Sequence, residues 1–209
     1  MEFVSGKLFG FILILTRIGA FFATVPVFSW QVLSVQTRTA IAIVLSLFFS
    51  ALIPNSFAGD LPLLYGILLL AQEAVYGLCL GLVAYCLFTV VQQAGRITER
   101  QMGLTMANIL DPFSGEQGQP LGMLLEILFI LLLFSTDGHH LLLKILSRSF
   151  DRYPLGSIPE IGRLTESVIL AGSHMFLLAL QMAAPILAAF LLLMVVLAFM
   201  AKVAPETNV

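Results

Sequence analysis

The sequence predicts an all-α protein that associates with a membrane, and three observations support this fold class. First, 59% of the 209 residues are hydrophobic and 11% are charged, whereas a soluble domain carries about 25% charged residues. Second, the mean hydropathy is +1.02. Third, the apolar residues gather in about five long runs that suit helical hairpins. The chain is therefore an integral membrane protein or a subunit buried in a very apolar assembly.

The first two apolar segments differ in length. Residues 8–28 are long enough to cross a hydrocarbon core of ~30 Å, and Pro26 marks the end of this run. Arg17 lies in its middle and no basic stretch precedes it, so we interpret it as an uncleaved helix rather than a signal peptide. Residues 39–53 are short for a full crossing, and we expect a half-crossing helix or one that packs on a partner.

The third segment, residues 63–91, is longer than one perpendicular crossing needs, so it must tilt, bend or protrude. Glu73, Gly77 and Gly81 follow one another at intervals that place them on one helix face. The two glycines form a GxxxG pair, which lets another helix approach closely. This face predicts a helix-packing surface with a buried polar contact at Glu73.

Polar stretches divide the chain, which we treat as one domain over residues 1–209. N-terminal helices occupy residues 1–91, a central loop occupies 92–120, and C-terminal helices occupy 121–209 with a polar interval at 147–166. Lys and Arg residues outside the apolar runs divide equally between the two sides of this arrangement, so the positive-inside rule assigns no orientation. We therefore expect kinked helices that need not be conventional membrane spans.

The last two segments carry internal polar residues or proline. We expect one helix from Pro120 to Leu146, and a second run at residues 168–203 in which Pro185 predicts a kink or two consecutive helices. Charged residues on the first of these recur on one face to within about 20°; they are Glu126, Asp137 and Lys144. This stripe fits a solute or proton path, or a set of intersubunit pairs and snorkelling ends. Because Ser, Thr, Asn and Gln are sparse, we favour the second interpretation.

Residues that could support chemistry are few. The run Asp137-Gly138-His139-His140 predicts a tight polar turn or helix break rather than a metal site, because adjacent helical histidines diverge by 100° and no second Cys/His cluster completes a zinc shell. No catalytic or phosphate-binding motif occurs in the sequence. We therefore expect neither an enzyme nor a cofactor. The net charge of -2, with Lys and Arg scattered singly, also argues against nucleic-acid binding.

Short motifs follow one order along almost the whole chain. They are Arg17 with Pro26, Glu73 with Gly77 and Gly81, the run Gln92–Leu104, Asp111-Pro112, Gly138-His139, Ser149-Phe150, Pro154, Ala184-Pro185, and Ala204-Pro205-Glu206-Thr207-Asn208. In this order and spacing they resemble the FliR family of flagellar biosynthetic proteins and its counterparts in virulence type III secretion.

The chain also departs from the family pattern. Asp137 stands where the family would have Asn before Gly-His, and Gln36 falls where a proline would precede Arg38. Family members usually continue beyond the Pro-x-x-Asn stretch into a further hydrophobic region. We therefore expect the 209-residue chain to be C-terminally truncated.

The resemblance implies a single-copy, non-enzymatic subunit of a protein-export gate. Its expected partners are FliP-like and FliQ-like membrane subunits, a FlhB-like export component and unfolded export substrates. The implied location is the flagellar basal body in the bacterial inner membrane, with the helices stacked around a channel raised largely above the bilayer. An injectisome copy remains open, although overall similarity favours the flagellum.

By the same resemblance, the central loop is a plug in the closed channel. The plug residues would be Met102, Gly103, Met106, Ile109, Leu110, Asp111, Pro112, Phe113, Gly115 and Gly118. Methionines give adaptable apolar contacts and glycines permit displacement, which suits this role. An ordinary surface loop, or a loop lying on a partner, would have the same composition.

An alternative function from another class is an ion-coupled small-solute transporter. Its coupling site would use Arg17, Glu73, Glu126 and Asp137, since charges inside apolar helices normally face a cavity, a partner or each other.

Overall fold

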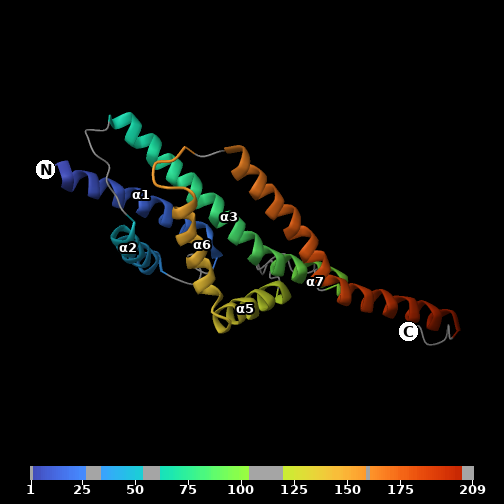
Figure 1. The fold of residues 1–209 in the computed structure, drawn as a ribbon. Helices are drawn as coiled ribbons and strands as arrows, with labels where there is room; N and C mark the ends of the chain where they lie inside the picture. Colours follow the sequence, from blue (N-terminus) through green and yellow to red (C-terminus); the bar gives the residue numbers. More distant parts are fainter. Residues whose placement is uncertain (1, 27–33, 54–61, 104–119, 159–160, 204–209) are drawn as a thin grey trace, which may run out of the picture. The chain divides into compact units, whose positions relative to one another are not determined.

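The computed structural model describes residues 2–26, 34–53, 62–103, 120–158 and 161–203 (Figure 1). Within these ranges the regular secondary structure is helical and contains no strand, which confirms the predicted all-α fold class. By length and composition, 4 of the described helices could cross a membrane, or up to 5 if a bent pair counts as one span. The chain forms two compact units. The first comprises Met1–Cys86 and Leu133–Gly172, and the second comprises Leu87–Leu132 and Ser173–Val209.

Helices α1 and α2 belong to the first unit. Helix α1, Glu2–Thr24, ends just before Pro26, as the sequence predicts. Helix α2, Val35–Leu52, begins at Val35 rather than Thr39, because the Ser34 hydroxyl caps the helix by accepting from the Thr37 N–H at 3.3 Å. The prediction of a short second segment is therefore wrong: the polar residues before the apolar run form the first turn of an 18-residue helix.

Helix α3, Leu63–Gln101, has 39 residues and continues well beyond Val91. Residues 92–101, which the sequence places in the central loop, are therefore helical. They contain no proline or interior break, and Thr98 and Glu99 are both buried. Low hydrophobicity was a poor marker of loop structure here, because tertiary packing covers these polar residues. The helix ends in a turn at Gly103, whose φ of 73° suits a residue without Cβ.

The predicted single helix from Pro120 to Leu146 is two helices. Helix α5, Pro120–Ser135, and helix α6, Gly138–Arg152, are bent by 75° at the intervening turn. Asp137 in this turn has φ 56°, a left-handed conformation that cannot continue a right-handed helix. The predicted helix break at Asp137 is thus confirmed, and the prediction of one continuous helix from Pro120 to Leu146 is wrong.

The predicted polar interval at 147–166 is also largely helical. Helix α6 extends to Arg152, and its buried residues Leu142, Leu146 and Phe150 recur every four positions. Helix α7, Ile161–Val203, is a single run of 43 residues with Pro185 inside it, which excludes two consecutive helices. Its most apolar 18-residue window is 0% buried within this chain.

Candidate functional site

A buried ion pair joins α1 to α3 inside the first unit. The Nε atom of Arg17 lies 2.5 Å from Oε2 of Glu73, and both side chains are 0% exposed. Charged groups withdrawn from water are costly unless further hydrogen bonds satisfy them. The surroundings of this pair supply such bonds.

Each partner makes a second set of contacts with the end of α6 and the turn after it. Nη1 of Arg17 donates to the carbonyl oxygens of Ser149 at 3.2 Å and Tyr153 at 3.0 Å. The Ser149 carbonyl also accepts the N–H of Tyr153 at 2.9 Å and thus takes two hydrogen bonds, and a cation at a helix C-terminus interacts favourably with the helix dipole. Oε1 of Glu73 accepts from the N–H of Gly156 at 3.1 Å. The pair therefore fixes α6 and its following turn onto α1 and α3.

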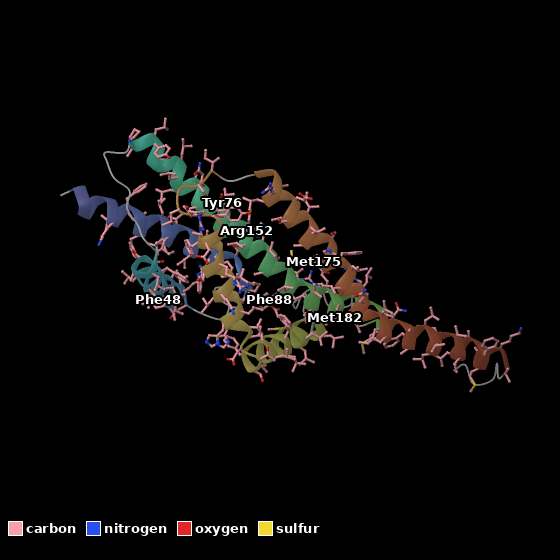
Figure 2. All side chains as sticks on the ribbon, in the orientation of Figure 1. Phe48, Tyr76, Phe88, Arg152, Met175 and Met182 are labelled. Atoms are coloured by element: carbon pink, nitrogen blue, oxygen red, sulfur yellow. The ribbon has the colours of Figure 1, made fainter. Side chains whose placement is uncertain are left out.

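Aromatic rings enclose the guanidinium group of Arg17. Its Cζ lies 4.5 Å from the ring centroid of Phe150 and 4.9 Å from that of Tyr76, within the range of cation–π attraction. Tyr76 stacks on Tyr153 with ring centroids 4.9 Å apart; Figure 2 labels Tyr76 on α3. The rings exclude water from the ion pair, which strengthens it electrostatically.

Gly77 and Gly81 lie against α1 next to this pair. A Cβ atom at Gly77 would overlap the carbonyl oxygen of Arg17, and one at Gly81 would lie 2.6 Å from Cβ of Thr24. The small face predicted from the sequence thus sits at a close contact between α1 and α3. Because Gly77 is one turn from Glu73, the same approach brings Arg17 within reach of the carboxylate.

A second buried carboxylate lies in the second unit. Glu99 of α3 is 2% exposed, and its Oε1 accepts the backbone N–H groups of Leu121 and Gly122, the latter at 3.0 Å. These two donors belong to the first turn of α5, where N–H groups have no intrahelical acceptor. Glu99 therefore caps a helix that lies about twenty residues further along the chain.

Close packing accompanies this cap. A Cβ at Gly95 would lie 2.5 Å from Cα of Gly122, so α3 and α5 meet with glycine on both sides. Further along the two helices, the rings of Phe88 and Phe129 form an edge-to-face contact with centroids 5.2 Å apart; Figure 2 labels Phe88. The α3–α5 contact thus extends from Phe88 to Glu99.

The sequence did not point to Gly95 or Glu99 as site residues. A weak signal was present in the spacing of Val91, Ala94 and Thr98, which continues a helical period from the third segment into the predicted loop, and the structure buries all three residues. Ser149, Tyr153 and Gly156 were also missed. Their contacts with the ion pair are made by backbone groups, which no side-chain pattern reveals.

Only part of the predicted plug falls within the described chain. Met102 is 46% exposed, and Gly103 adopts φ 73° at the end of α3. The other predicted plug residues lie outside the described residues; they are Met106, Ile109, Leu110, Asp111, Pro112, Phe113, Gly115 and Gly118.

The predicted polar stripe is not continuous. Glu126 is half-buried on α5, Asp137 is exposed in the turn, and Lys144 is exposed on α6, beyond the 75° bend. The periodicity argument assumed one straight helix, so it fails at the turn. Asp137 instead lies 3.4 Å from Nδ1 of His140, an exposed contact within the first turn of α6.

One group of described residues places several metal-ligating atoms together. One ligand atom from each of Asp137, His139 and His140 lies within 4.8 Å of the others. The centroids of the two imidazole rings lie 4.1 Å apart, although adjacent residues on a helix point about 100° away from each other. Asp137 and His140 are exposed to solvent, and the trio fits a single polar turn as readily as a ligand set.

Comparison with known proteins covers nearly the whole chain. The family described as "Bacterial export proteins, family 1" matches residues 8–209. The flagellar biosynthetic protein FliR of Bacillus subtilis (strain 168) is 35% identical over 206 residues, which cover 95% of this chain and 78% of that relative. FliR of Escherichia coli (strain K12) is 29% identical over 197 residues, covering 93% and 74%. The Yop proteins translocation protein T of Yersinia pestis is 31% identical over 211 residues, covering 100% and 81%.

Proposed function

Because the chain belongs to family 1 of the bacterial export proteins, we propose that it is a subunit of a type III protein-export apparatus in the bacterial inner membrane. The observation that carries this proposal is the family match over residues 8–209. Relatives named for flagellar biosynthesis and for Yop translocation are both similar to this chain over 95% or more of its length, so both kinds of apparatus fit the chain. The 35% identity to a flagellar relative favours a flagellar basal body.

Within this apparatus, the proposed role is that of a channel subunit that passes unfolded proteins. Helix α7 supports a place in a larger assembly, since its most apolar window is 0% buried within this chain. Such a surface requires lipid or other apolar helices as neighbours. FliP-like and FliQ-like membrane subunits and a FlhB-like component are the proposed partners, and the chain itself carries out no chemical reaction.

The stretch connecting α3 to α5 is the proposed channel plug. Its composition supports this role through apolar residues that can seal a pore and glycines that permit displacement, including Gly103 at a positive φ. Both of its ends adjoin helices that pack on each other. This packing gives the connecting stretch a fixed base.

The burial of the central ion pair disfavours an ion-coupled transporter. Arg17 and Glu73 are 0% exposed and bind each other, so neither is free to exchange an ion with solvent. Asp137 is exposed in the turn between α5 and α6 and takes no part in the contacts of this pair. The buried charges therefore support a structural role for the pair.

Purification in mild detergent followed by intact-mass measurement tests the proposed function. A gate subunit should co-purify in fixed ratio with different hydrophobic proteins of the export apparatus. A homogeneous homo-oligomer that transports a small solute by itself would overturn the proposal.

Deletion of Asp111–Gly118 tests the plug separately. We expect the membrane to become leaky to small solutes while the complex still assembles, because the helices that carry the contacts described above stay intact. An unchanged leak with an intact complex would overturn the plug assignment and leave membership of the export apparatus untouched.

A further inference from the structure

An apolar pocket lies within the first unit, among α1, α2, α6 and the end of α5 (Figure 1). Its volume is about 410 Å³, and pockets that hold small ligands span ~300–1,000 Å³. Phe22 of α1, Val44 of α2 and Leu143 of α6 are among the residues that line it, and the wall is apolar. The pocket therefore suits an apolar ligand.

The pocket follows α2 lengthwise. Its lining on this helix runs from Thr37 to Leu45, which is about 12 Å of helix at a rise of 1.5 Å per residue. Both α1 and α2 are long and apolar enough to cross a membrane, so lipid hydrocarbon surrounds them if they do. A wall of this length and composition fits one extended hydrocarbon chain.

The polar groups of the pocket gather at one end. Phe49 of α2 contacts Phe150 of α6, with ring centroids 5.6 Å apart, whereas the pocket joins earlier parts of the same two helices. The helices therefore run in the same direction, and both begin at the same end of the pocket. Thr37 lines this end on α2, and His139 lines it on α6.

Positive charge lies close to this end. Arg38, which is half-buried, and Lys144, which is exposed, each directly follow a lining residue. His140 also follows a lining residue, and a carboxylate oxygen of the exposed Asp137 lies 3.4 Å from its Nδ1. One carboxylate against two permanent cations leaves a net positive charge, which is complementary to a phosphate group.

A nitrogen atom in the lining lacks a hydrogen-bond partner. Nδ1 of His139 is buried and makes no hydrogen bond within the described residues, although the ring stacks near Phe134 with centroids 5.1 Å apart. A polar atom that is buried without a partner is costly, so its presence points to a group that the ligand supplies. An ester oxygen can accept a hydrogen bond from this nitrogen in its N–H form.

We propose that this pocket binds an anionic phospholipid. One acyl chain lies along α2 against Leu143, the ester group meets His139, and the phosphate meets Arg38 and Lys144. The order apolar, ester, phosphate matches the order of groups along the pocket. The inference does not depend on a role in protein export and assigns a ligand to the first unit alone.

The size of the pocket favours a lipid over a helix of a partner protein. A helix about 10 Å across would fill about 900 Å³ over a length of 12 Å, more than twice the volume of the pocket. A hydrophobic helix also brings no group that satisfies both the buried nitrogen and the cations at one end. The partner helix is therefore the competing occupant that the experiment must distinguish.

A photoactivatable lipid identifies the occupant. The protein is purified in mild detergent with its accompanying subunits, incubated with phosphatidylglycerol that carries a diazirine in one acyl chain, irradiated and mapped by mass spectrometry. We expect labelled peptides from residues 37–45 and 139–143. Label confined to other surfaces, such as the exposed apolar part of α7, would overturn the proposal. Absence of label because another subunit fills the pocket would overturn it equally.

Filling the pocket tests whether the label reports this site. Ala40 lines the pocket, and Ala40→Phe should lower labelling of residues 139–143 at least roughly fivefold, because overpacking costs the bound chain its space. Ala51→Phe makes the same change at another exposed alanine of α2, outside the pocket, and should leave labelling unchanged. Equal labelling of the two variants, both in intact complexes, would overturn the proposal. If Ala40→Phe does not assemble, the mapped labels of the unsubstituted protein decide.

Competition by unlabelled lipid tests the headgroup. Phosphatidylglycerol should displace the label more effectively than phosphatidylcholine, and Arg38→Gln or Lys144→Gln should each weaken that displacement roughly fivefold. Arg152→Gln, at the opposite end of α6, is the matched control and should have no effect (Figure 2). Equal displacement by the two lipids, unchanged in Arg38→Gln and Lys144→Gln, would overturn the assignment of an anionic phospholipid.

Discussion

Gly95 of α3 and Gly122 of α5 are in backbone contact. A Cβ atom at Gly95 would lie 2.5 Å from Cα and 2.9 Å from N of Gly122. Both neighbours are main-chain atoms, so no side-chain rotation can relieve the overlap. The contact therefore requires glycine at position 95, and it brings Glu99, four residues later on the same face, to the first turn of α5.

Gly95→Ala should consequently destabilise the assembled subunit. Forcing a methyl group into this contact must separate the two helices and weaken the Glu99 cap, at a cost of about 1–3 kcal/mol. Thermal unfolding of the purified complex measures the effect as a lower Tm. Gly172→Ala is the matched control, because a Cβ there would meet nothing within 4 Å. Equal Tm values for the two variants would contradict the close contact.

A second glycine comparison tests the α1–α3 contact. Gly77→Ala would place a methyl group against the carbonyl oxygen of Arg17, whereas Gly19→Ala on α1 would meet nothing within 4 Å. We expect Gly77→Ala to lower the Tm of the complex through overpacking of about 1–3 kcal/mol. Gly19→Ala should leave the Tm unchanged or raise it slightly, since Ala favours helix over Gly. The reverse order would show that α1 does not pack on this face.

The sequence predicted the main elements of this fold because membrane-like helices are uniformly apolar. Long hydrophobic runs located the interiors of the helices well, and proline located the end of α1. The predicted helix boundaries were wrong where helices carry polar residues, as at residues 92–101 and 147–152. Hydrophobicity reflects the free energy of transferring a side chain from water to an apolar environment. It does not predict which polar residues other helices will bury.

The candidate sites were predicted unevenly for a related reason. A charge within an apolar run needs a polar partner, so Arg17 and Glu73 were predicted to make polar contacts. The structure places the two side chains together. Their pairing could not be derived, because it depends on helix packing across distant segments. Glu99 was not predicted, because its partners are backbone N–H groups that become available together only at the first turn of α5.

The ion pair can be tested by a double-mutant cycle. Arg17→Met should leave the carboxylate of Glu73 buried without its counter-charge, at a cost of about 3–5 kcal/mol. Glu73→Leu should be comparably destabilising, because the guanidinium loses its partner. The double variant should recover much of the loss, since no unpaired charge remains, and the Tm of the complex measures each corner of the cycle. Additive single effects would contradict a direct pair.

The turn between α5 and α6 distinguishes a structural role from ion coupling. Asp137 has φ 56° and its side chain makes no capping hydrogen bond, so the backbone shape is what the position requires. Asn adopts this conformation readily, whereas a β-branched residue is strained there by about 1–2 kcal/mol. Asp137→Asn should therefore preserve both the Tm and protein export, measured as substrate secreted into the medium, while Asp137→Val should lower the Tm. A coupling carboxylate would show the opposite dependence, because Asn cannot carry its charge or its proton. Loss of export in Asp137→Asn with an unchanged Tm would contradict this prediction and show that the carboxylate itself is required at this position.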